Sequence, residues 1–410
     1  MEIKTIAFYN RPFPAGGAET VSRNLAYYFH SQGIRSIIYT SLFQEDRLTE
    51  QDRKTFEVKV LPDSKNESLP VNVDFLRDSL RIEQVDVLII QGLTEFPFDQ
   101  LHGVVHTKLI FCLHSIPLWE VYDWRIRKSS QLWNPTFLRR MEFIFLRKPV
   151  YRFTDKLKRR YLRRYAGIHK NTDKFVALCP EYYLQLYQSL KKFNPDLSKF
   201  AAIANPVLPA QEPTACPKEK TVLYVGRFSY CDKRVDRLLR IWKIVEKNAP
   251  DWRLILVGGG SEEANLRKLA AKLRLKRVEF AGYQTDTAPF YRRASFVCLT
   301  SAFEGFGMCL VEAQQYGAIP VSFDSYAAVR EITENGEAGI LVPPFSIRKY
   351  AQALLRAFAD EKGQEQMRQT CYQAAARYEL KMIGEQWLRL FRELDSDNKP
   401  NPEKKAPTAD

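Results

Sequence analysis

Apolar runs alternate with helical patterns along the first third of the chain. Residues 4–9 have the apolar character of a buried strand, and residues 18–31 carry apolar side chains at the spacing of a helix. Four further strands are predicted, at residues 36–39, 87–90, 109–113 and 175–178. Pro180 follows the last of them and marks the start of a helix. Strands that alternate with helices in this way predict a parallel sheet with helices on both faces.

The alternation stops near the middle of the chain and then restarts. Residues 204–220 carry four prolines and no apolar periodicity, which is typical of a linker. Beyond it five more strands are predicted, at residues 222–225, 253–257, 278–281, 296–299 and 319–322. We therefore expect the α/β class, with two doubly wound domains that face each other across a cleft. Such a cleft, at the carboxyl ends of parallel strands, is the expected place for a ligand.

The same pattern divides the chain into regions. We expect an N-terminal domain at residues 1–204, a linker at residues 205–219 and a C-terminal domain at residues 220–378. Residues 379–394 are predicted to form an amphipathic helix that packs across the domain junction. The polar residues 395–410 are predicted to be a disordered tail.

Composition excludes several classes of protein. Of the 410 residues, 45% are hydrophobic and 27% are charged, which is ordinary for a soluble globular chain and unlike a collagen, a coiled coil or a disordered protein. No apolar run is long enough for a membrane-spanning helix, and the first residues do not resemble a signal peptide. The seven cysteines are scattered without a C-x-x-C pair, so we expect neither a zinc ribbon nor a disulfide framework. Together these features favour the cytoplasm.

The net charge of +14 comes almost entirely from one segment. Residues 119–170 hold 15 Lys and Arg against 4 Asp and Glu, while the rest of the chain is nearly neutral. A local excess of positive charge favours a polyanionic partner, which leaves nucleic acid, an anionic membrane and phosphorylated substrates as candidates. No zinc knuckle, RNA-recognition signature or helix-turn-helix supports the first of these, so we expect no nucleic acid partner.

A glycine-containing turn between a strand and a helix carries candidate chemistry. Gly305 and Gly307 follow the strand predicted at residues 296–299, and a helical pattern begins at residue 308. Glycines there let a ligand approach the backbone, and the N–H groups of the helix start favour phosphate oxygens. Glu304 lies in the turn, and Glu312 lies eight residues later in an apolar stretch of the helix. The pattern alone is equally compatible with two solvated glutamates.

Two other turns follow strands of the same domain. Gly226 and Arg227 directly follow the strand predicted at residues 222–225, and Lys233 comes shortly afterwards. A guanidinium and an ammonium group suit a diphosphate, although each alone also fits an ordinary surface cation. The glycine-rich loop at residues 257–263 lacks the Lys-Ser/Thr of a P-loop and the third glycine of a dinucleotide-binding fingerprint. ATPase and dehydrogenase functions are therefore disfavoured.

These motifs resemble those of the retaining glycosyltransferases of family 4. The E-x7-E spacing of Glu304 and Glu312 is similar to the family signature, and so are the motifs at residues 226–233 and 257–260. Further similarities lie at residues 16–19 and 205–206, whereas residues 119–170 match no motif of the family. The resemblance implies a GT-B fold of two Rossmann-like domains. It also implies an acceptor-binding N-terminal domain, a donor-binding C-terminal domain and a last helix that crosses back to the N-terminal domain.

The resemblance also implies roles for individual residues. Arg227 and Lys233 would hold the diphosphate of a nucleotide-sugar donor, Glu304 would contact the transferred sugar, and Glu312 would bind the ribose. His114 follows the strand predicted at residues 109–113, where the family often has a sugar-contacting histidine, so Glu304 and His114 are the candidate catalytic residues. The remaining candidate donor-binding residues are Gly16, Gly17, Gly258, Phe306 and Gly307.

The activity implied is retaining transfer of a sugar to a glycan or lipid-linked acceptor, as in the synthesis of cell-surface polysaccharide or lipopolysaccharide. The donor would be a UDP-sugar, or alternatively a GDP-sugar, with no cofactor and no bound metal. The one D-x-D sequence, at residues 395–397, follows no strand and is interpreted as solvated charge. A sugar-nucleotide epimerase or phosphorylase on the same fold, a nucleic-acid-binding protein and an inactive sugar-nucleotide sensor are the alternatives.

The basic segment predicts a membrane-facing surface. Two helices are expected, at residues 134–148 and 153–168, and both combine aromatic or aliphatic side chains with arginines and lysines. Helices of this kind lie in the interface of an anionic membrane. Candidate membrane-binding residues in the second helix are Arg159, Arg160, Arg163 and Arg164. The enzyme would then be cytoplasmic and peripheral at the inner face of the membrane. The alternative is that the aromatic residues pack on the domain core and leave a solvated basic face.

Overall fold

The computed structural model describes residues 3–14, 16–122, 141, 142, 145, 155–210 and 217–396. Its N-terminal domain is built on one parallel sheet with the strand order β5-β3-β1-β6-β7-β8-β9. The strands are β1 (Thr5–Tyr9), β3 (Arg35–Thr40), β5 (Phe56–Val60), β6 (Val87–Gln91), β7 (Lys108–Leu113), β8 (Lys174–Ala177) and β9 (Phe200–Ala202). A separate two-residue pair joins β2 (Pro12–Phe13) to β4 (Leu42–Phe43).

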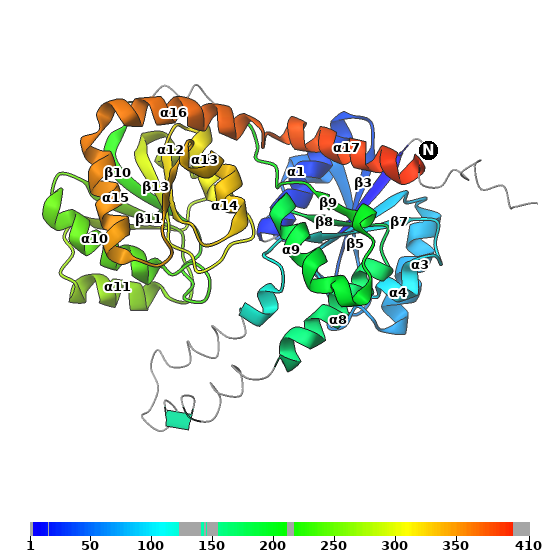
Figure 1. Ribbon diagram of the computed structural model, residues 1–410. Coiled ribbons are helices and arrows are strands. Elements are labelled where there is room, and N and C mark those ends of the chain that lie inside the picture. The colour runs from blue at the N-terminus through cyan, green and yellow to red at the C-terminus, as the bar shows by residue number, and fades with distance from the viewer. Residues whose placement is uncertain are drawn as a thin grey trace, which may run out of the picture.

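Helices cover both faces of this sheet, as Figure 1 shows. They are α1 (Gly17–Ser31), α2 (Glu50–Thr55), α3 (Pro70–Ile82), α4 (Phe98–Leu101), α8 (Lys156–Lys170) and α9 (Pro180–Leu190), with short 3-10 turns at Glu45–Arg47, Lys191–Phe193 and Leu197–Lys199. Consecutive residues of β1 point to opposite faces, so Phe8 joins one apolar cluster and Tyr9 the other. Burial on both faces explains why the central strands are continuous apolar runs.

The C-terminal domain repeats this architecture with the strand order β12-β11-β10-β13-β14-β15, again all parallel. Its strands are β10 (Glu219–Val225), β11 (Arg253–Val257), β12 (Val278–Gly282), β13 (Ala294–Leu299), β14 (Ile319–Phe323) and β15 (Ile340–Val342). Its helices are α10 (Val235–Asn248), α11 (Glu263–Lys272), α12 (Ala288–Arg293), α13 (Met308–Gln315), α14 (Ala327–Ile332), α15 (Ile347–Ala359) and α16 (Glu361–Ala376), with a 3-10 turn at Glu334–Gly336.

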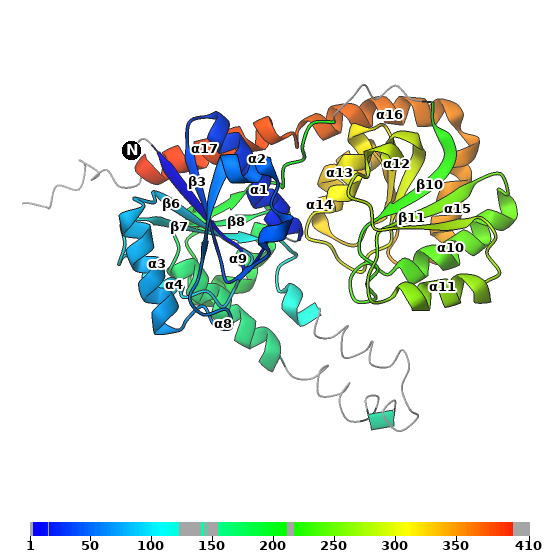
Figure 2. The same cartoon turned by 180° about the vertical axis from the view of Figure 1, so that it is seen from behind.

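The last helix, α17 (Leu380–Ser396), leaves the C-terminal domain and lies along the N-terminal one (Figure 2). The ring of Phe391 lies 5.7 Å from that of Phe29 in α1. Gly384 is so close to Tyr28 of α1 that a Cβ there would lie 2.2 Å from the ring. The apolar side of α17 is buried, and its members are Ile383, Trp387, Leu390, Phe391 and Leu394.

The strands that the hydrophobic pattern predicts are present, but the pattern misses the two-residue strands β2 and β4 and also three strands of the two large sheets. These three are β5, β9 and β15, and each lies at an edge of its sheet. An edge strand is short or partly solvated, so its apolar pattern is weak: β5 reads FEVKV, β9 reads FAA and β15 reads ILV. The predicted sheets were therefore too narrow.

Two predicted boundaries also differ from the structure. The segment expected to be linker to residue 219 is shorter, because β10 already begins at Glu219 and pairs there with Ala294 of β13. The last helix reaches Ser396 rather than ending at Leu394. Residues 397–410 of the predicted tail lie outside the described residues. Within the part of the chain that the structure describes, no helix is both long and apolar enough to span a membrane.

Candidate active site

The loops that follow β10 and β11 each hydrogen-bond to the last residue of the neighbouring strand. The Gly226 N–H donates to the Val257 carbonyl at 3.0 Å, and the Gly258 N–H donates to the Gly282 carbonyl at 2.8 Å. A Cβ on Gly258 would lie 2.0 Å from the Gly226 oxygen, and its φ of +130° disfavours other residues as well. The motif glycines 226 and 258 thus hold the two loops against each other and give this edge of the sheet a fixed shape.

Lys233 and Glu304 meet at this edge although 71 residues separate them. The Lys233 Nζ lies 2.6 Å from the Glu304 Oε1, and the Ser301 hydroxyl donates to the same oxygen at 2.6 Å. Both charged side chains are largely enclosed, with 19% and 10% of their surface exposed. Sequence reasoning assigned both charged residues to a site but did not predict their pairing, and it missed Ser301.

The ion pair keeps a positive charge in a place that otherwise disfavours it. Burial alone would lower the pKa of Lys233, but the attraction of Glu304 outweighs it and raises that pKa above its ordinary value. The ammonium group is therefore retained at neutral pH. The second oxygen of Glu304 makes no hydrogen bond within the described residues, so the carboxylate still has an acceptor for a ligand hydroxyl.

Arg227 extends from the same loop toward solvent. Its guanidinium is 78% exposed and pairs with Asp232 at 3.2 Å. Burial alone would raise the pKa of Asp232, but a hydrogen bond from Ser229 and the charges of Lys233 and Arg227 lower it below its ordinary value. Asp232, which sequence reasoning did not single out, thus ties the two cations together while leaving the guanidinium free to bind an anion.

The start of α13 adds backbone donors to this arrangement. Gly307 occupies the N-cap position with a φ of +96° and provides no side-chain cap. The first N–H groups of α13 therefore have no capping side chain, which favours an anion at this end of the helix. Phe306 is buried, with its ring 5.3 Å from that of Tyr378. Its side chain holds the loop in place, so a ligand would meet only the backbone of Phe306 and Gly307.

Glu312 lies further along α13 and is satisfied by a protein partner. The Tyr291 hydroxyl, from α12, donates to the Glu312 Oε2 at 2.6 Å. Burial raises the pKa of Glu312 above its ordinary value. The Oε1 of Glu312 makes no hydrogen bond to any described residue, which leaves it available for a ligand hydroxyl. The sequence pattern indicated a partner for this carboxylate but gave no signal for Tyr291.

His114 reaches this site from the N-terminal domain. A Cβ on Gly305 would lie 2.1 Å from the His114 carbonyl oxygen, so the turn between β13 and α13 rests directly on the segment that follows β7. The Tyr182 hydroxyl, from α9, also donates across the junction to the Glu304 carbonyl at 3.1 Å. The two candidate catalytic residues, from opposite domains, are thus brought to the same junction. Position 305 requires glycine, because the Cβ of any other residue would clash with the His114 carbonyl oxygen.

The His114 imidazole is held in a neutral state. Burial lowers the pKa of His114 to about 4, and the side chain of Asn205 opposes this shift only in part. Its Nε2 is hydrogen-bonded to the Gln91 side chain at the end of β6. Asn205 belongs to the Asn-Pro motif seen in the sequence, whereas Gln91 carried no sequence signal.

Two glycines lie at the start of α1, in the segment that follows β1 and β2. Gly16 and Gly17 are exposed, and Gly16 is the N-cap of α1 without a side-chain cap. The carboxylate of Glu19 lies over Gly16, where a Cβ would be 2.1 Å from it. Burial raises the pKa of Glu19. This end of α1 therefore combines open backbone donors with one enclosed carboxylate.

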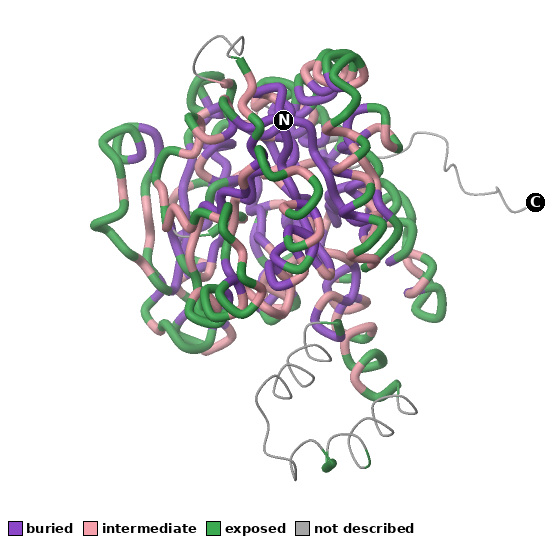
Figure 3. Tube along the Cα trace, turned by 90° about the vertical axis from the view of Figure 1, so that its left-hand side faces the viewer, coloured by how far each residue is buried: buried purple, intermediate pink, exposed green. Residues whose placement is uncertain are grey.

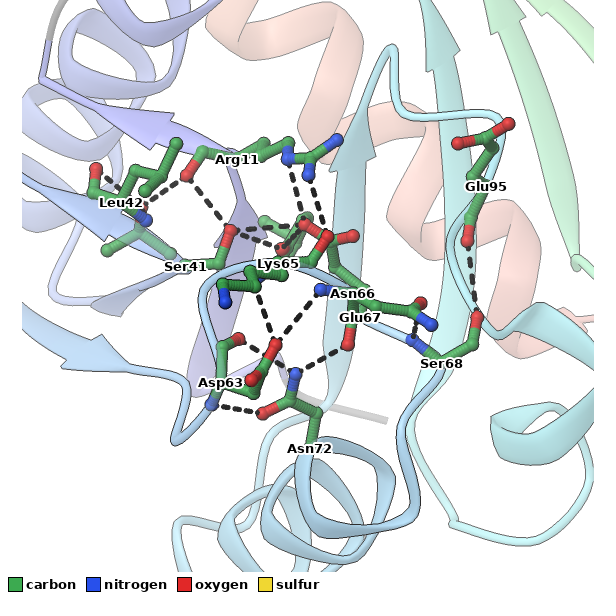
Figure 4. Close-up of polar contacts among 12 residues, drawn as sticks. Arg11, Ser41, Leu42, Asp63, Lys65, Asn66, Glu67, Ser68, Asn72 and Glu95 are labelled. Atoms are coloured by element: carbon green, nitrogen blue, oxygen red, sulfur yellow. Dashed lines mark hydrogen bonds and ion pairs between the residues drawn. The ribbon is translucent and has the colours of Figure 1, made fainter.

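A second polar network lies at the same edge of the N-terminal sheet, near the ends of β1, β3 and β5 (Figure 4). The carboxylate of Glu67 is buried, and it accepts hydrogen bonds from Tyr9 at 3.0 Å and Ser41 at 3.1 Å. The Arg11 Nε lies 3.3 Å from the same carboxylate. The network was not visible in the sequence, because its members are up to 58 residues apart. It fixes the loops at this edge of the N-terminal domain.

The basic helix α8 divides into an exposed part and a buried part (Figure 3). Arg159, Arg160 and Arg163 are exposed, but Arg164 pairs with Glu95 at 2.7 Å and only 23% of its side chain is exposed. The aromatic and aliphatic side chains of this helix were predicted to face a membrane in the row 153, 157, 161 and 165. Residue 153 lies outside the described residues, and the other three pack on the domain core: Leu157, Tyr161 and Tyr165. The hydroxyl of Tyr165 donates to the buried Glu120 at 3.0 Å. The apolar side of this helix is therefore used within the protein.

Several predictions lie partly beyond the described residues, including residues 211–216 of the linker and residues 153 and 154 of the second basic helix. Of the first basic helix, at residues 134–148, only residues 141, 142 and 145 are described. Asp397 of the D-x-D sequence is not described either. Among the His, Cys, Asp and Glu residues of the described ranges, no group is arranged to hold a metal ion.

The chain is similar in sequence to known glycosyltransferases. Residues 210–375 match the family model of the glycosyl transferases group 1. An uncharacterized glycosyltransferase of Haemophilus influenzae is 29% identical over 380 residues, which are 91% of this chain and 95% of that protein. The GDP-mannose:cellobiosyl-diphosphopolyprenol alpha-mannosyltransferase of Xanthomonas campestris is 35% identical over 150 residues, or 34% of this chain and 39% of that protein.

The fold is also that of solved structures. The crystal structure of Alr3699/HepE from Anabaena in complex with UDP superposes with a TM-score of 0.72 at 17% identity, and the match covers 95% of this chain and all of that one. The resemblance seen in the motifs is thereby confirmed: residues 210–375 match the group 1 glycosyl transferases, and the whole chain has the GT-B fold.

Proposed function

We propose that the protein transfers a hexose from a nucleotide diphosphate sugar to a glycan or lipid-linked acceptor, with retention of the anomeric configuration. The observation that carries this proposal is the meeting of Lys233 and Glu304 beside Arg227, directly opposite His114 of the other domain. Cations that suit a diphosphate lie next to a carboxylate and a neutral imidazole that suit sugar hydroxyls. A site of this composition fits both halves of a nucleotide-sugar donor.

The diphosphate would lie between the cations and the start of α13. Breaking the bond between the sugar C1 and the phosphate oxygen leaves additional negative charge on the nucleoside diphosphate. Arg227, Lys233 and the free N–H groups behind Gly307 are already in place to stabilise this charge as it develops. Gly258 has no side chain, so its loop packs closely against Gly226 and would leave room for the diphosphate. These residues supply the positive charge themselves, so we propose that neither a metal ion nor a cofactor is required.

The two glutamates would hold the sugar and the ribose. Glu304 has one carboxylate oxygen free for a hydroxyl of the transferred sugar, and Glu312 has one free for the ribose. His114 would contact the same sugar from the opposite side, and Gly16 and Gly17 would line the cleft beside the diphosphate. The acceptor oxygen would attack C1 on the face from which the phosphate departs. The leaving phosphate would take the acceptor's proton, so that the configuration at C1 is kept.

The acceptor is proposed to be presented at a membrane. Arg159, Arg160 and Arg163 are exposed residues of α8, which lies on the N-terminal domain (Figure 1), the domain proposed to bind the acceptor. The relative from Xanthomonas is named for a diphosphopolyprenol-linked acceptor, which is a lipid that carries a glycan. We therefore propose a cytoplasmic enzyme, peripheral at the inner face of the membrane, that acts in the synthesis of cell-surface polysaccharide or lipopolysaccharide. Nucleic acid has no part in this function.

A donor panel tests the proposal. UDP- and GDP-sugars would be compared by thermal stabilisation and by hydrolysis, and then by transfer to polyprenyl-diphosphate-linked saccharides with NMR analysis of the new anomeric bond. We expect a UDP-sugar to be preferred, since the similar solved structure holds UDP, with a GDP-sugar as the alternative. A product with inverted configuration would contradict retention. Release of a free epimer, or transfer to inorganic phosphate, would instead support an epimerase or a phosphorylase.

A further inference from the structure

His114 is coupled to a residue on the neighbouring strand that no sequence motif includes. In the register of β6 and β7, Gln91 pairs with Cys112, so His114 follows two residues later on the same face of the sheet. The buried Gln91 side chain points toward α1 and lies between Ser22 of that helix and the His114 imidazole. Gln91 thus connects the start of α1 with the candidate catalytic histidine.

The hydrogen bonds determine which way the Gln91 amide is oriented. The Ser22 hydroxyl donates its one proton to the Ala18 carbonyl at 3.3 Å. Ser22 can therefore only accept from Gln91, and the Gln91 Nε2 donates to it at 3.0 Å. This places the Gln91 Oε1 against the His114 Nε2. Because a carbonyl oxygen only accepts hydrogen bonds, the His114 Nε2 must carry the proton.

The other ring nitrogen is then an acceptor. The His114 Nδ1 is buried and makes no hydrogen bond to any described residue. An enclosed acceptor without a donor is unfavourable, and the hydroxyl of a bound sugar would satisfy it. We propose that Gln91 is a positioning residue that holds His114 in the Nε2–H tautomer, so that Nδ1 accepts a hydrogen bond from a substrate hydroxyl. This inference rests on the proposed function only for the identity of that hydroxyl.

The groups around the imidazole maintain its neutral state. Gln91 faces it from β6, Asn205 faces it from the segment that follows β9, and Gly305 of the other domain rests on its backbone. Within the described ranges no charged side chain contributes to the lowered pKa of His114, which falls to about 4 because of burial. A neutral donor-acceptor group at position 91 therefore fixes the tautomer without attracting a second proton.

The tautomer can be observed directly, in the full-length protein without any substrate. In a 15N-labelled sample the ring nitrogens of the five histidines are resolved by two-dimensional NMR, and the His114 signals are assigned from their loss in His114→Asn. We expect a protonated Nε2 and an unprotonated Nδ1 from pH 8 down to pH 5. A protonated Nδ1, or an equal mixture of tautomers, would overturn the proposal.

The Gln91→Glu variant tests the part played by the amide. A glutamate at this position still accepts from the His114 Nε2, but its negative charge favours the imidazolium. We expect the pKa of His114 to rise by at least one unit, a tenfold change in acid dissociation. The same charge change at the exposed Gln366, in Gln366→Glu, should leave that pKa unchanged. Equal pKa values in wild type and Gln91→Glu would contradict the coupling. If Gln91→Glu does not fold, Ser22→Ala replaces it and should produce a tautomer mixture by freeing the amide.

Kinetics separate positioning from mere stability. With an active donor and acceptor, Gln91→Met should lower kcat roughly tenfold, as is typical for a residue that orients a functional histidine. In a His114→Ala background the same change should have no further effect, because its role is exerted through the imidazole. If the losses of kcat caused by Gln91→Met and His114→Ala were additive in the double variant, the inference would be wrong. If no sugar is transferred at all but the NMR results hold, the tautomer assignment stands and the proposed function fails.

Discussion

At the scale of single residues, the site balances its charges before any ligand arrives. Burying the Lys233 ammonium group would be unfavourable without its ion pair to Glu304. The Arg227 guanidinium pairs with Asp232 but remains mostly exposed to water. The two cations are therefore not equivalent. Lys233 belongs to an internal pair whose loss would disturb the loop, whereas Arg227 is the cation that a ligand can recruit without breaking the structure.

The exposed position of Arg227 leads to a prediction about the donor. Arg227→Ala should weaken nucleoside diphosphate binding about 10- to 100-fold, because it removes a charged hydrogen-bond donor to the phosphates. Arg53→Ala, which removes a comparably exposed arginine paired with Glu45, should not change the affinity. Titration calorimetry provides the measurement. Activity should also survive EDTA; its complete loss, together with an unchanged affinity in Arg227→Ala, would show that a metal ion holds the phosphates.

The two glutamates should be separable by kinetics. Glu304→Gln should lower kcat on the order of 100-fold, because the contact with the reacting sugar strengthens in the transition state. Glu312→Gln should mainly raise the KM for the donor, about tenfold, because ribose is bound equally before and during reaction. Tyr291 can still donate to a glutamine at position 312, so that variant should fold. An effect of Glu304→Gln on KM alone would remove Glu304 from the reacting sugar.

At the scale of elements, α8 shows how one helix serves two purposes. Its apolar row packs on the N-terminal domain through Leu157, Tyr161 and Tyr165, and Arg164 pairs with Glu95. The cations that remain exposed are on the opposite side of the helix. Any attraction of this helix to a membrane is therefore electrostatic and not hydrophobic. The affinity should fall with salt, as expected for exposed charges.

Vesicle binding tests this element. Changing Arg159, Arg160 and Arg163 to Ser should weaken sedimentation with phosphatidylglycerol vesicles about 100-fold at low salt, since each exposed cation contributes about 1 kcal/mol. The matched control changes three exposed arginines of the C-terminal domain, Arg267, Arg274 and Arg277, and removes the same net charge. Equal loss in both triple variants would show that only total charge matters. Failure of the wild-type protein to bind would refute the membrane proposal.

At the scale of the whole molecule, two connections decide how the domains meet. The helix α17 lies on α1 through Phe391 and Phe29, and Gly305 rests on the His114 carbonyl. The first is apolar and holds the chain end to the N-terminal domain. The contact between Gly305 and His114 lies at the site, and it is possible only because residue 305 has no side chain. Opening of the cleft would separate the second contact while the first persists.

The contact at Gly305 makes the closed arrangement sensitive to one methyl group. Gly305→Ala should hold the domains apart, because its Cβ would lie 2.1 Å from the His114 oxygen. Small-angle scattering with saturating UDP should then show a larger radius of gyration than wild type, together with a strong loss of turnover. Tm should be nearly unchanged, because the clash lies between domains. Gly167→Ala, in α8 with open space around it, is the control; compaction of Gly305→Ala to the wild-type value would argue against closure at this point.

Periodicity was sufficient to predict the α/β class and the central strands, whereas the roles assigned to the site residues stay predictions. Central strands are recognisable because burial on both faces requires continuous apolar runs, as in β6 and β13. Lys233 and Glu304 could be expected to lie close together because parallel strands bring the loops after them to one edge, and in the structure they form an ion pair. The edge strands β5, β9 and β15 were not recognisable, because pairing on one side leaves only short or mixed patterns.

The partners of the site residues were settled only by tertiary structure. The pairing of Lys233 with Glu304, of Glu312 with Tyr291 and of Gln91 with His114 joins residues between 21 and 71 positions apart. The amphipathic pattern of α8 is the same whether its apolar side contacts a membrane or a protein core. In the structure this side packs on the core of the N-terminal domain. A sequence specifies which side chains are available and their periodicity, but hydrogen bonds and ion pairs depend on distances that only the packed sheets and the two-domain junction determine.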